Sequence, residues 1–172
     1  AKSLGISVVE LFGGPTREKV RVYWSHCGTS RSRHYDLLDT PPINSMSDIT
    51  NLGKEVVRKG FTALKTNIIL PGDPASVWMG GFGGGKGTTD QYITKSLLNH
   101  VETLIGTFRD AVGDEVDINL DLNFNFKTEA CLRIAKVLEK FDLLWLEIDM
   151  YQPESIKQIK ESTTTRICTG EN

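Results

Sequence analysis

Three acidic residues stand at the ends of three successive strand-like segments. Asp121, Glu147 and Glu171 are separated by 26 (147 − 121) and 24 residues (171 − 147), and each interval accommodates one helix and one strand. Because the carboxyl ends of parallel strands meet at one edge of a sheet, we expect the three carboxylates to converge there. Carboxylates that share a partly dry site repel one another unless a cation neutralises them. The spacing therefore predicts a divalent-cation site.

The type of ligand narrows the choice of cation. Carboxylate oxygens with open positions for water and substrate suit magnesium, and the absence of His and Cys from the set argues against zinc or copper. We therefore expect Mg²⁺ as the cofactor. The alternative is that each acid caps the following helix or pairs with a lysine at the surface.

Lys65 is a further residue that could take part in catalysis. Side chains alternate along a strand, so Lys65 and Asn67 should share the inner face of their strand while Leu64 faces the helices. An unpaired ammonium there would be strongly disfavoured. Beside a substrate carboxylate it could stabilise developing negative charge or accept a proton. A structural pairing with Asp121 or Glu147 is the alternative.

Alternating strand and helix patterns are expected to position these side chains. The predicted strands are residues 20–25, 61–69, 117–123, 143–149 and 166–171. The predicted helices begin at Ser47 or Asp48 and end before Gly60, or span residues 93–112, 130–141 and 153–162. This order is typical of a parallel sheet, either doubly wound or the first part of a closed barrel. The first strand-to-helix turn lacks the glycine fingerprint of a dinucleotide fold, which favours the barrel.

Composition describes an ordinary globular domain. The 172 residues are 39% hydrophobic and 24% charged, with a net charge of −2, so neither nucleic acid nor an anionic membrane is an expected partner. No apolar run approaches about 18 residues and no basic-then-apolar leader is present, so we expect no membrane span and a cytoplasmic location. The three cysteines, Cys27, Cys131 and Cys168, are expected to be free thiols, the buried state being typical.

Four motifs in order resemble the enolase superfamily, in the mandelate racemase/muconate lactonizing enzyme group that includes sugar-acid dehydratases. The motifs are Lys65-Thr66-Asn67, which is similar to the Lys-x-Lys of the second barrel strand, Asp121-Leu122-Asn123, Trp145-Leu146-Glu147 and Gly170-Glu171. The segment Leu11-Phe12-Gly13-Gly14-Pro15 resembles the junction after the N-terminal capping domain. The resemblance implies a capping-domain tail and linker in residues 1–17. It also implies that residues 18–172 are the first half of a TIM-type (β/α)8 barrel, about five strands with four helices.

The resemblance also implies an activity. Enzymes of this superfamily use a Lys or His base with one or two magnesium ions that stabilise an ene-diolate. The implied reaction is removal of the proton α to a carboxylate of a small-molecule substrate, with dehydration of a sugar acid favoured. The implied metal ligands are Asp121, Glu147 and Glu171. Lys65 is the implied catalytic residue, and the implied substrate-binding residues are Ser25, His26, Asn67 and Asn123.

Two departures from the family pattern limit how far the family's activity can be expected of this chain. Asn67 replaces the second lysine of the motif, and an amide cannot act as a general base near neutral pH, so dehydration is favoured over two-base racemisation. A racemase or epimerase of a 2-hydroxy acid is the alternative. The family's later strands, with a histidine-aspartate pair and a further acid, do not appear in the sequence. A truncated, non-catalytic fragment is therefore a further alternative, and we expect homo-oligomers that cover the open sheet.

A glycine-rich run lies in the long loop that follows the second predicted strand. Residues 80–87 nearly spell a phosphate-binding loop, but Gly87 stands where Ser or Thr should bind magnesium, and the run begins ten residues after the strand. We predict a lid over the pocket mouth rather than a nucleotide site.

Overall fold

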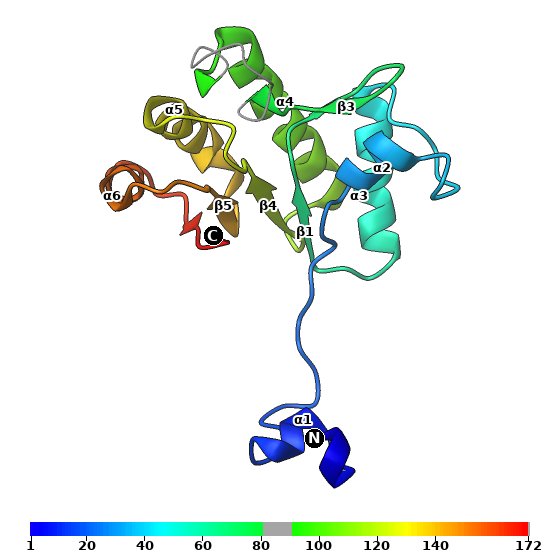
Figure 1. The fold of residues 1–172 in the computed structure, drawn as a ribbon. Helices are drawn as coiled ribbons and strands as arrows, with labels where there is room; N and C mark the ends of the chain where they lie inside the picture. Colours follow the sequence, from blue (N-terminus) through cyan, green and yellow to red (C-terminus); the bar gives the residue numbers. More distant parts are fainter. Residues whose placement is uncertain (81–90, 172) are drawn as a thin grey trace.

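Four parallel strands form the main sheet of the computed structural model, which describes residues 1–80 and 91–171. The strands are β1 (Ala63–Thr66), β4 (Asp117–Asp121), β5 (Trp145–Glu147) and β6 (Ile167–Cys168), in the order β1-β4-β5-β6. Helices α4 (Lys95–Val112), α5 (Thr128–Leu138) and α6 (Pro153–Glu161) connect successive strands, and η4 (Glu139–Phe141) extends α5 (Figure 1). This repetition confirms the predicted α/β class.

The strand register sorts the side chains onto two faces. Parallel partners point the same way, so Asp121, Glu147 and Cys168 share one layer of the inner face. The partners Lys65, Asn119 and Trp145 form the adjacent layer of the same face. The opposite face packs against the helices, and its residues are Leu64, Ile118, Leu120 and Leu146, all fully buried. The predicted division of polar and apolar faces is therefore confirmed.

Helix α3 (Met46–Arg58) precedes β1 and packs against α4. Asp48 Oδ2 accepts a hydrogen bond of 2.9 Å from the backbone N–H of Ser45, so the helix cap is Ser45 and not Ser47 or Asp48 as predicted. A Cβ added at Gly53 would lie 2.6 Å from Cβ of Ala111, which shows how closely α3 and α4 approach. Gly60, with φ of 75°, ends the segment as predicted.

The predicted first strand is shorter than expected. Within residues 20–25 only Trp24 is bridged, in parallel with Leu64, while Val20 and Val22 are 71% and 64% exposed. These apolar residues have no neighbouring strand in the described structure on their other side, so the β pattern is not completed. The prediction of a strand across all six residues is therefore wrong in extent.

Regular structure also follows the first two predicted strands, and the predicted strand at 61–69 is divided, with Ile69 in a separate short strand. Helix α2 (Thr29–His34) follows the Trp24 bridge, and β2 (Ile69–Leu70) pairs antiparallel with β3 (Ser76–Val77). Both elements are too short for hydrophobic periodicity to reveal them. Most of the glycine-rich run falls in residues 81–90, which lie outside the described residues.

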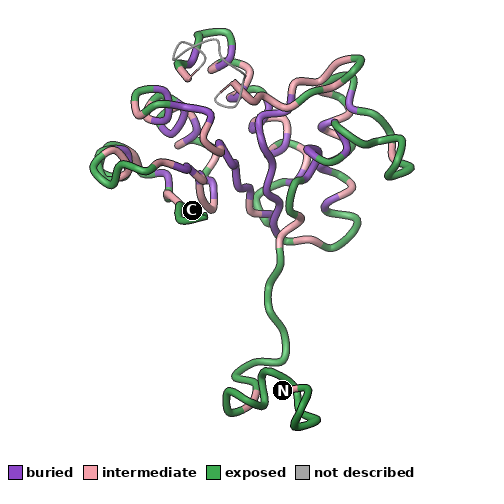
Figure 2. The backbone as a smooth tube through the Cα atoms, viewed as in Figure 1, coloured by how far each residue is buried: buried purple, intermediate pink, exposed green. Residues whose placement is uncertain are grey.

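The N-terminal segment lies apart from the sheet. Its elements are η1 (Lys2–Leu4) and α1 (Val8–Leu11), and neither contains a buried residue. An exposed stretch joins this segment to the sheet, as Figure 2 shows. No helix in the described part of the chain is long and apolar enough to span a membrane.

The cysteines have reduced thiols. Cys27 and Cys131 are buried, as expected, and Cys168 is half-buried. Burial raises the pKa of both Cys27 and Cys131 to about 12, so these two thiols are chemically inert near neutral pH.

Candidate functional site

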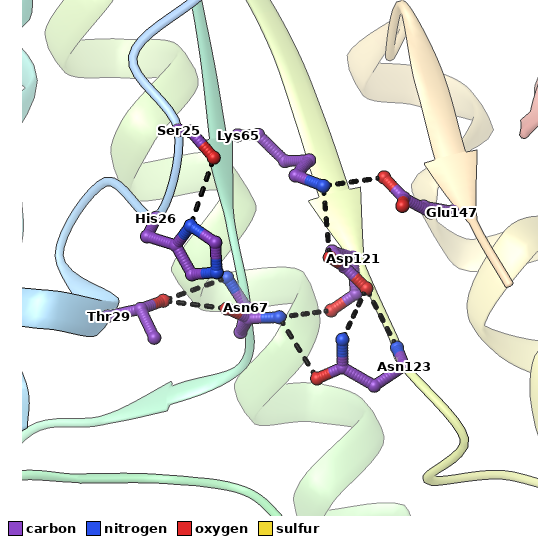
Figure 3. Close-up of polar contacts among 8 residues, drawn as sticks. All are labelled: Ser25, His26, Thr29, Lys65, Asn67, Asp121, Asn123 and Glu147. Carbon is purple, nitrogen blue, oxygen red and sulfur yellow. Dashed lines mark hydrogen bonds and ion pairs between the residues drawn. The ribbon is translucent and has the colours of Figure 1, made fainter. Parts of the chain in front are cut away.

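An ammonium lies between two carboxylates on the inner face of the sheet. Lys65 Nζ is 2.8 Å from Glu147 Oε2 and 3.1 Å from Asp121 Oδ2 (Figure 3). The side chains are only 11%, 12% and 5% exposed, respectively. Burial alone would lower the pKa of Lys65, but the hydrogen bond to Glu147 and the charge of Asp121 outweigh it and raise the pKa above its usual value. Lys65 is therefore a cation in this arrangement.

Asn123 holds the second oxygen of Asp121. Its backbone N–H and its side-chain Nδ2 both donate to Asp121 Oδ1, at 2.9 and 2.8 Å. Asn123 has φ of 49°, in the left-handed region that asparagine tolerates better than most residues. One carboxylate oxygen thus faces Asn123, and the other faces Lys65.

Asn67 is buried and fully hydrogen-bonded within the protein. Its Nδ2 donates to the backbone carbonyl of Asp121 at 3.1 Å and to Asn123 Oδ1 at 3.2 Å. Its Oδ1 accepts from Thr29 Oγ1 at 2.8 Å. Asn67 therefore lies in the site as predicted, but its donors are directed to protein acceptors. The role of substrate donor stays a prediction.

Thr29 is a residue of the site that sequence reasoning missed. It is 3% exposed and begins α2, a helix whose six residues give no clear periodic signal. The available signal was its place directly after Gly28, in the turn that follows the first strand.

Ser25 and His26 lie at the same edge of the sheet. Backbone hydrogen bonds on either side anchor them, from Lys65 to the carbonyl of Trp24 at 2.9 Å and from Cys27 to the carbonyl of Lys65 at 2.8 Å. Ser25 Oγ and His26 Nδ1 are 3.0 Å apart. Figure 3 shows both side chains on the same side of the site as Asn67. Their predicted place beside the pocket is compatible with this geometry, and contact with substrate stays a prediction.

Asp149 extends the acidic cluster. It is 5% exposed, and burial, together with the charges of Asp121, Glu171 and Glu147, raises its pKa to about 6. Lys65 opposes this shift. The alternation of Trp145, Glu147 and Asp149 along the strand is the sequence signal that directs this side chain inward, although it predicts no function for it.

The predicted metal ligands are only partly assembled. Asp121 and Glu147 converge on Lys65, whereas Glu171 is exposed and follows Gly170, beyond the end of β6. Within residues 1–80 and 91–171, no three His, Cys, Asp or Glu side chains are arranged to hold a metal ion. The donor set nevertheless suits magnesium, because all the donors are carboxylate oxygens.

Polar and aromatic groups lie one layer closer to the amino ends of the strands. Asn119 is fully buried, and within the described part of the chain its side-chain amide has no hydrogen-bond partner. Trp145 Nε1 is also unpaired there, and the Trp145 ring contacts the Tyr23 ring edge-on at 5.6 Å between centroids. Buried polar groups are normally paired, so this face differs from an ordinary apolar core.

Known proteins match the chain over nearly its whole length. The model of a family described as "Enolase C-terminal domain-like" matches residues 48–172. D-xylonate dehydratase of Haloferax volcanii is 28% identical over 174 residues, covering 99% of this chain and 37% of that protein. D-gluconate dehydratase of Thermoproteus tenax is 29% identical over 173 residues, covering 99% of this chain and 29% of that protein.

A solved structure shows the same arrangement of elements. A proposed L-alanine-DL-glutamate epimerase from Burkholderia xenovorans strain LB400 is similar with a TM-score of 0.89 and 34% identity. The similarity covers 99% of this chain and 43% of that chain. A second structure of that protein, bound to magnesium and fumarate, gives a TM-score of 0.85. The chain thus spans less than half the length of these relatives.

Proposed function

Because the chain belongs to the enolase C-terminal domain-like family, we propose that it supplies the cation site of an enzyme that removes the proton α to a carboxylate. Its parallel sheet is part of a (β/α)8 barrel, and the carboxyl ends of barrel strands are where such enzymes place their chemistry. The observation that carries the proposal is the buried placement of Lys65 between Asp121 and Glu147 at those strand ends.

Asp121, Glu147 and Glu171 would hold Mg²⁺ in this proposal. A bound magnesium ion would polarise the substrate carboxylate and stabilise the negative charge that develops on it. Two observations support the assignment: the donors are oxygens alone, and a relative with 34% identity has been solved with magnesium and the dicarboxylate fumarate.

Lys65 would bind the substrate carboxylate as a cation. Its contacts with Asp121 and Glu147 raise its pKa, so it is an ammonium and not a base in this arrangement. An ammonium stabilises negative charge that grows in the transition state, which is the electrostatic form of catalysis. Lys65 would therefore orient the substrate rather than accept its proton.

Dehydration of a sugar acid is the reaction that we favour. Asn67 cannot accept a proton, and its amide is committed to Thr29, Asp121 and Asn123. Racemisation by two bases would need a base on this strand, whereas dehydration needs one group that removes the proton and returns it to the leaving hydroxyl. The relatives that carry the name of sugar-acid dehydratases agree with this choice.

An epimerase is the second candidate. The observation in its favour is the similarity to the proposed L-alanine-DL-glutamate epimerase, at 34% identity. Both candidates begin with loss of an α-proton, and they differ in the later step. Dehydration forms a keto acid, whereas epimerisation returns a solvent proton to the same carbon.

The proposal is tested by incubating the complete protein with a panel of sugar acids and Mg²⁺ in deuterated water. Keto-acid formation is measured chemically, and deuterium at the α-carbon is measured by NMR. We expect keto acid from at least one sugar acid, no reaction after chelation of Mg²⁺, and none in Glu147→Gln.

Glu129→Gln is the matched control, because Glu129 is 57% exposed and, within the described residues, pairs with Arg133 at 3.6 Å. This variant should retain the full rate. Epimer formation with solvent deuterium but without keto acid would transfer the assignment to the second candidate. An unchanged rate in Glu147→Gln or after chelation would refute the cation site.

A further inference from the structure

A continuous chain of hydrogen bonds leads from α2 to Asp121. Thr29 Oγ1 donates to Asn67 Oδ1 at 2.8 Å, Asn67 Nδ2 donates to Asn123 Oδ1 at 3.2 Å, and Asn123 Nδ2 donates to Asp121 Oδ1 at 2.8 Å (Figure 3). We infer that this chain fixes the carboxylate of Asp121 for cation binding, with Thr29 as a positioning residue. The inference rests on the proposed cation site.

Every polar group of the Asn67 side chain is used in this chain. Its backbone N–H contacts Thr29 Oγ1 at 3.4 Å, and its Nδ2 also donates to the backbone carbonyl of Asp121 at 3.1 Å. The Thr29 hydroxyl donates to Asn67 Oδ1 and accepts from the backbone N–H of Asn67, so it determines the orientation of the Asn67 side-chain amide. The amide orientation in turn presents Nδ2 to Asn123. Loss of the hydroxyl would leave Asn67 Oδ1 without its donor and would free the amide to turn.

The chain determines how Asp121 presents its two oxygens. Oδ1 accepts two hydrogen bonds from Asn123, so Oδ2 is turned toward Lys65 and the side of Glu147. Groups that hydrogen-bond to a metal-ligating carboxylate orient it, and their removal typically lowers metal affinity by about 10–100-fold. Asn123 occupies that position relative to the Asp121 carboxylate, Asn67 holds the side chain of Asn123, and Thr29 holds the amide of Asn67.

The elements that carry Thr29 are firmly anchored. A Cβ added at Gly28, which has φ of 82°, would lie 2.4 Å from Ile69 Cδ1, so the start of α2 lies tightly against β2. Arg31 on α2 pairs with Glu55 on α3 at 3.0 Å, and both side chains are largely buried. Thr29 is therefore held on a rigid support, which is what a positioning residue requires.

The test compares three threonine variants by their affinity for Mn²⁺, which serves as a spectroscopic probe for Mg²⁺ and is measured by calorimetry and electron paramagnetic resonance. Thr29→Val removes the hydroxyl at nearly constant volume, and Thr29→Ser restores it. Thr165→Val is the matched control, because Thr165 is 8% exposed and its Oγ1 donates at 3.1 Å to the carbonyl of Ala135, outside the site.

We expect Thr29→Val to bind Mn²⁺ about tenfold more weakly, at the lower end of the effect of removing an outer-shell partner. Thr29→Ser should recover most of the affinity. Thr165→Val should lose a similar amount of thermal stability while its affinity stays unchanged. A merely structural role of Thr29 would make the two valine variants alike in both measurements, and that result would overturn the inference.

Failure of the proposed function has a different signature. If wild-type protein and Glu147→Gln bind Mn²⁺ equally, the cation site is refuted, whatever Thr29 does. If Glu147→Gln loses binding and Thr29→Val does not, the site stands and the positioning chain is refuted. A crystal structure of Thr29→Val in which Asn67, Asn123 and Asp121 keep their contacts would also refute the chain, independently of any metal.

Discussion

Replacing Lys65 with methionine should destabilise the protein by about 3–5 kcal/mol near neutral pH, the usual cost of removing one partner from a buried ion pair. The variant keeps the volume of the side chain and removes its charge. Asp121 and Glu147 are 5% and 12% exposed, so water cannot replace the ammonium at either one. At the observed separations of 3.1 and 2.8 Å, one such attraction amounts to about 5 kcal/mol at an effective dielectric constant of about 20. Desolvation of the ammonium offsets part of the total.

The loss should depend on pH and on Mg²⁺. Lys65 opposes the rise in the pKa of Asp149, so without Lys65 that pKa should lie still further above its ordinary value of 3.8, and the folded variant should bind more protons than the unfolded chain. Its stability should therefore rise as the pH falls from about 7 toward 4. In wild-type protein the Lys65 contribution is complete below the ordinary pKa of 10.5 and is lost as the pH rises through the higher value of the folded state. Mg²⁺ should restore stability to the variant if Asp121 and Glu147 are cation ligands.

Urea denaturation followed by tryptophan fluorescence measures the effect. Lys157→Met is the control, because Lys157 and Glu161 are 74% and 65% exposed and 3.8 Å apart, so its loss should cost at most about 0.5 kcal/mol. If Lys65→Met is as stable as wild-type protein and shows no dependence on pH, the reasoning about a buried charge cluster is refuted.

Three further predictions concern the scaffold. Hydrogen bonds from Lys136, the backbone of Thr164 and the hydroxyl of Thr163 lower the pKa of Glu139 from 4.5 to about 2. Glu139→Gln should therefore melt at a lower temperature than wild-type protein near neutral pH, and the difference should vanish as the pH falls from about 4.5 through about 2. A difference in circular-dichroism melting temperature that stays constant over this range would contradict the prediction. Phe108→Ala should cost about 3–5 kcal/mol in urea denaturation, because Phe108 is fully buried on α4, and a loss under about 1 kcal/mol would contradict that packing. Gly53→Val should cost about 1–3 kcal/mol by forcing α3 away from Ala111, and an unchanged urea midpoint would show that the helices separate freely.

Hydrophobic periodicity in the sequence was sufficient to predict the long helices and strands of the fold. The apolar stripe of α4 and the alternation in β4 and β5 are local patterns that tertiary packing reinforces. The shorter α2 and the β2–β3 pair have no such pattern; α2 contacts β3, and its Arg31 pairs with Glu55 of α3, residues distant in the sequence. The prediction of a strand at residues 20–25 was wrong in extent for a different reason. The composition of this segment favours a strand, but only Trp24 is bridged to a neighbouring strand.

The part of the site that depends on the alternation of side chains along a strand could be predicted from the sequence. The inward directions of Lys65, Asp121 and Glu147 follow from that rule. Their pairing was foreseen only as an alternative, because strand register and side-chain reach decide it. Thr29 could not be found in this way, since it meets Asn67 across 38 residues through the position of α2. The hydrogen bonds of the Asn67 amide likewise depend on three elements at once.

The proposed function requires that Asp121, Glu147 and Glu171 together bind one divalent cation. A crystal structure of the complete protein soaked with Mn²⁺, with anomalous scattering measured at the manganese edge, tests it most directly. We expect one anomalous peak within coordination distance of all three carboxylates, and we expect Lys65 to be released from at least one of its acidic partners. A peak bound elsewhere, or no peak with Lys65 still joined to both Asp121 and Glu147, would contradict it.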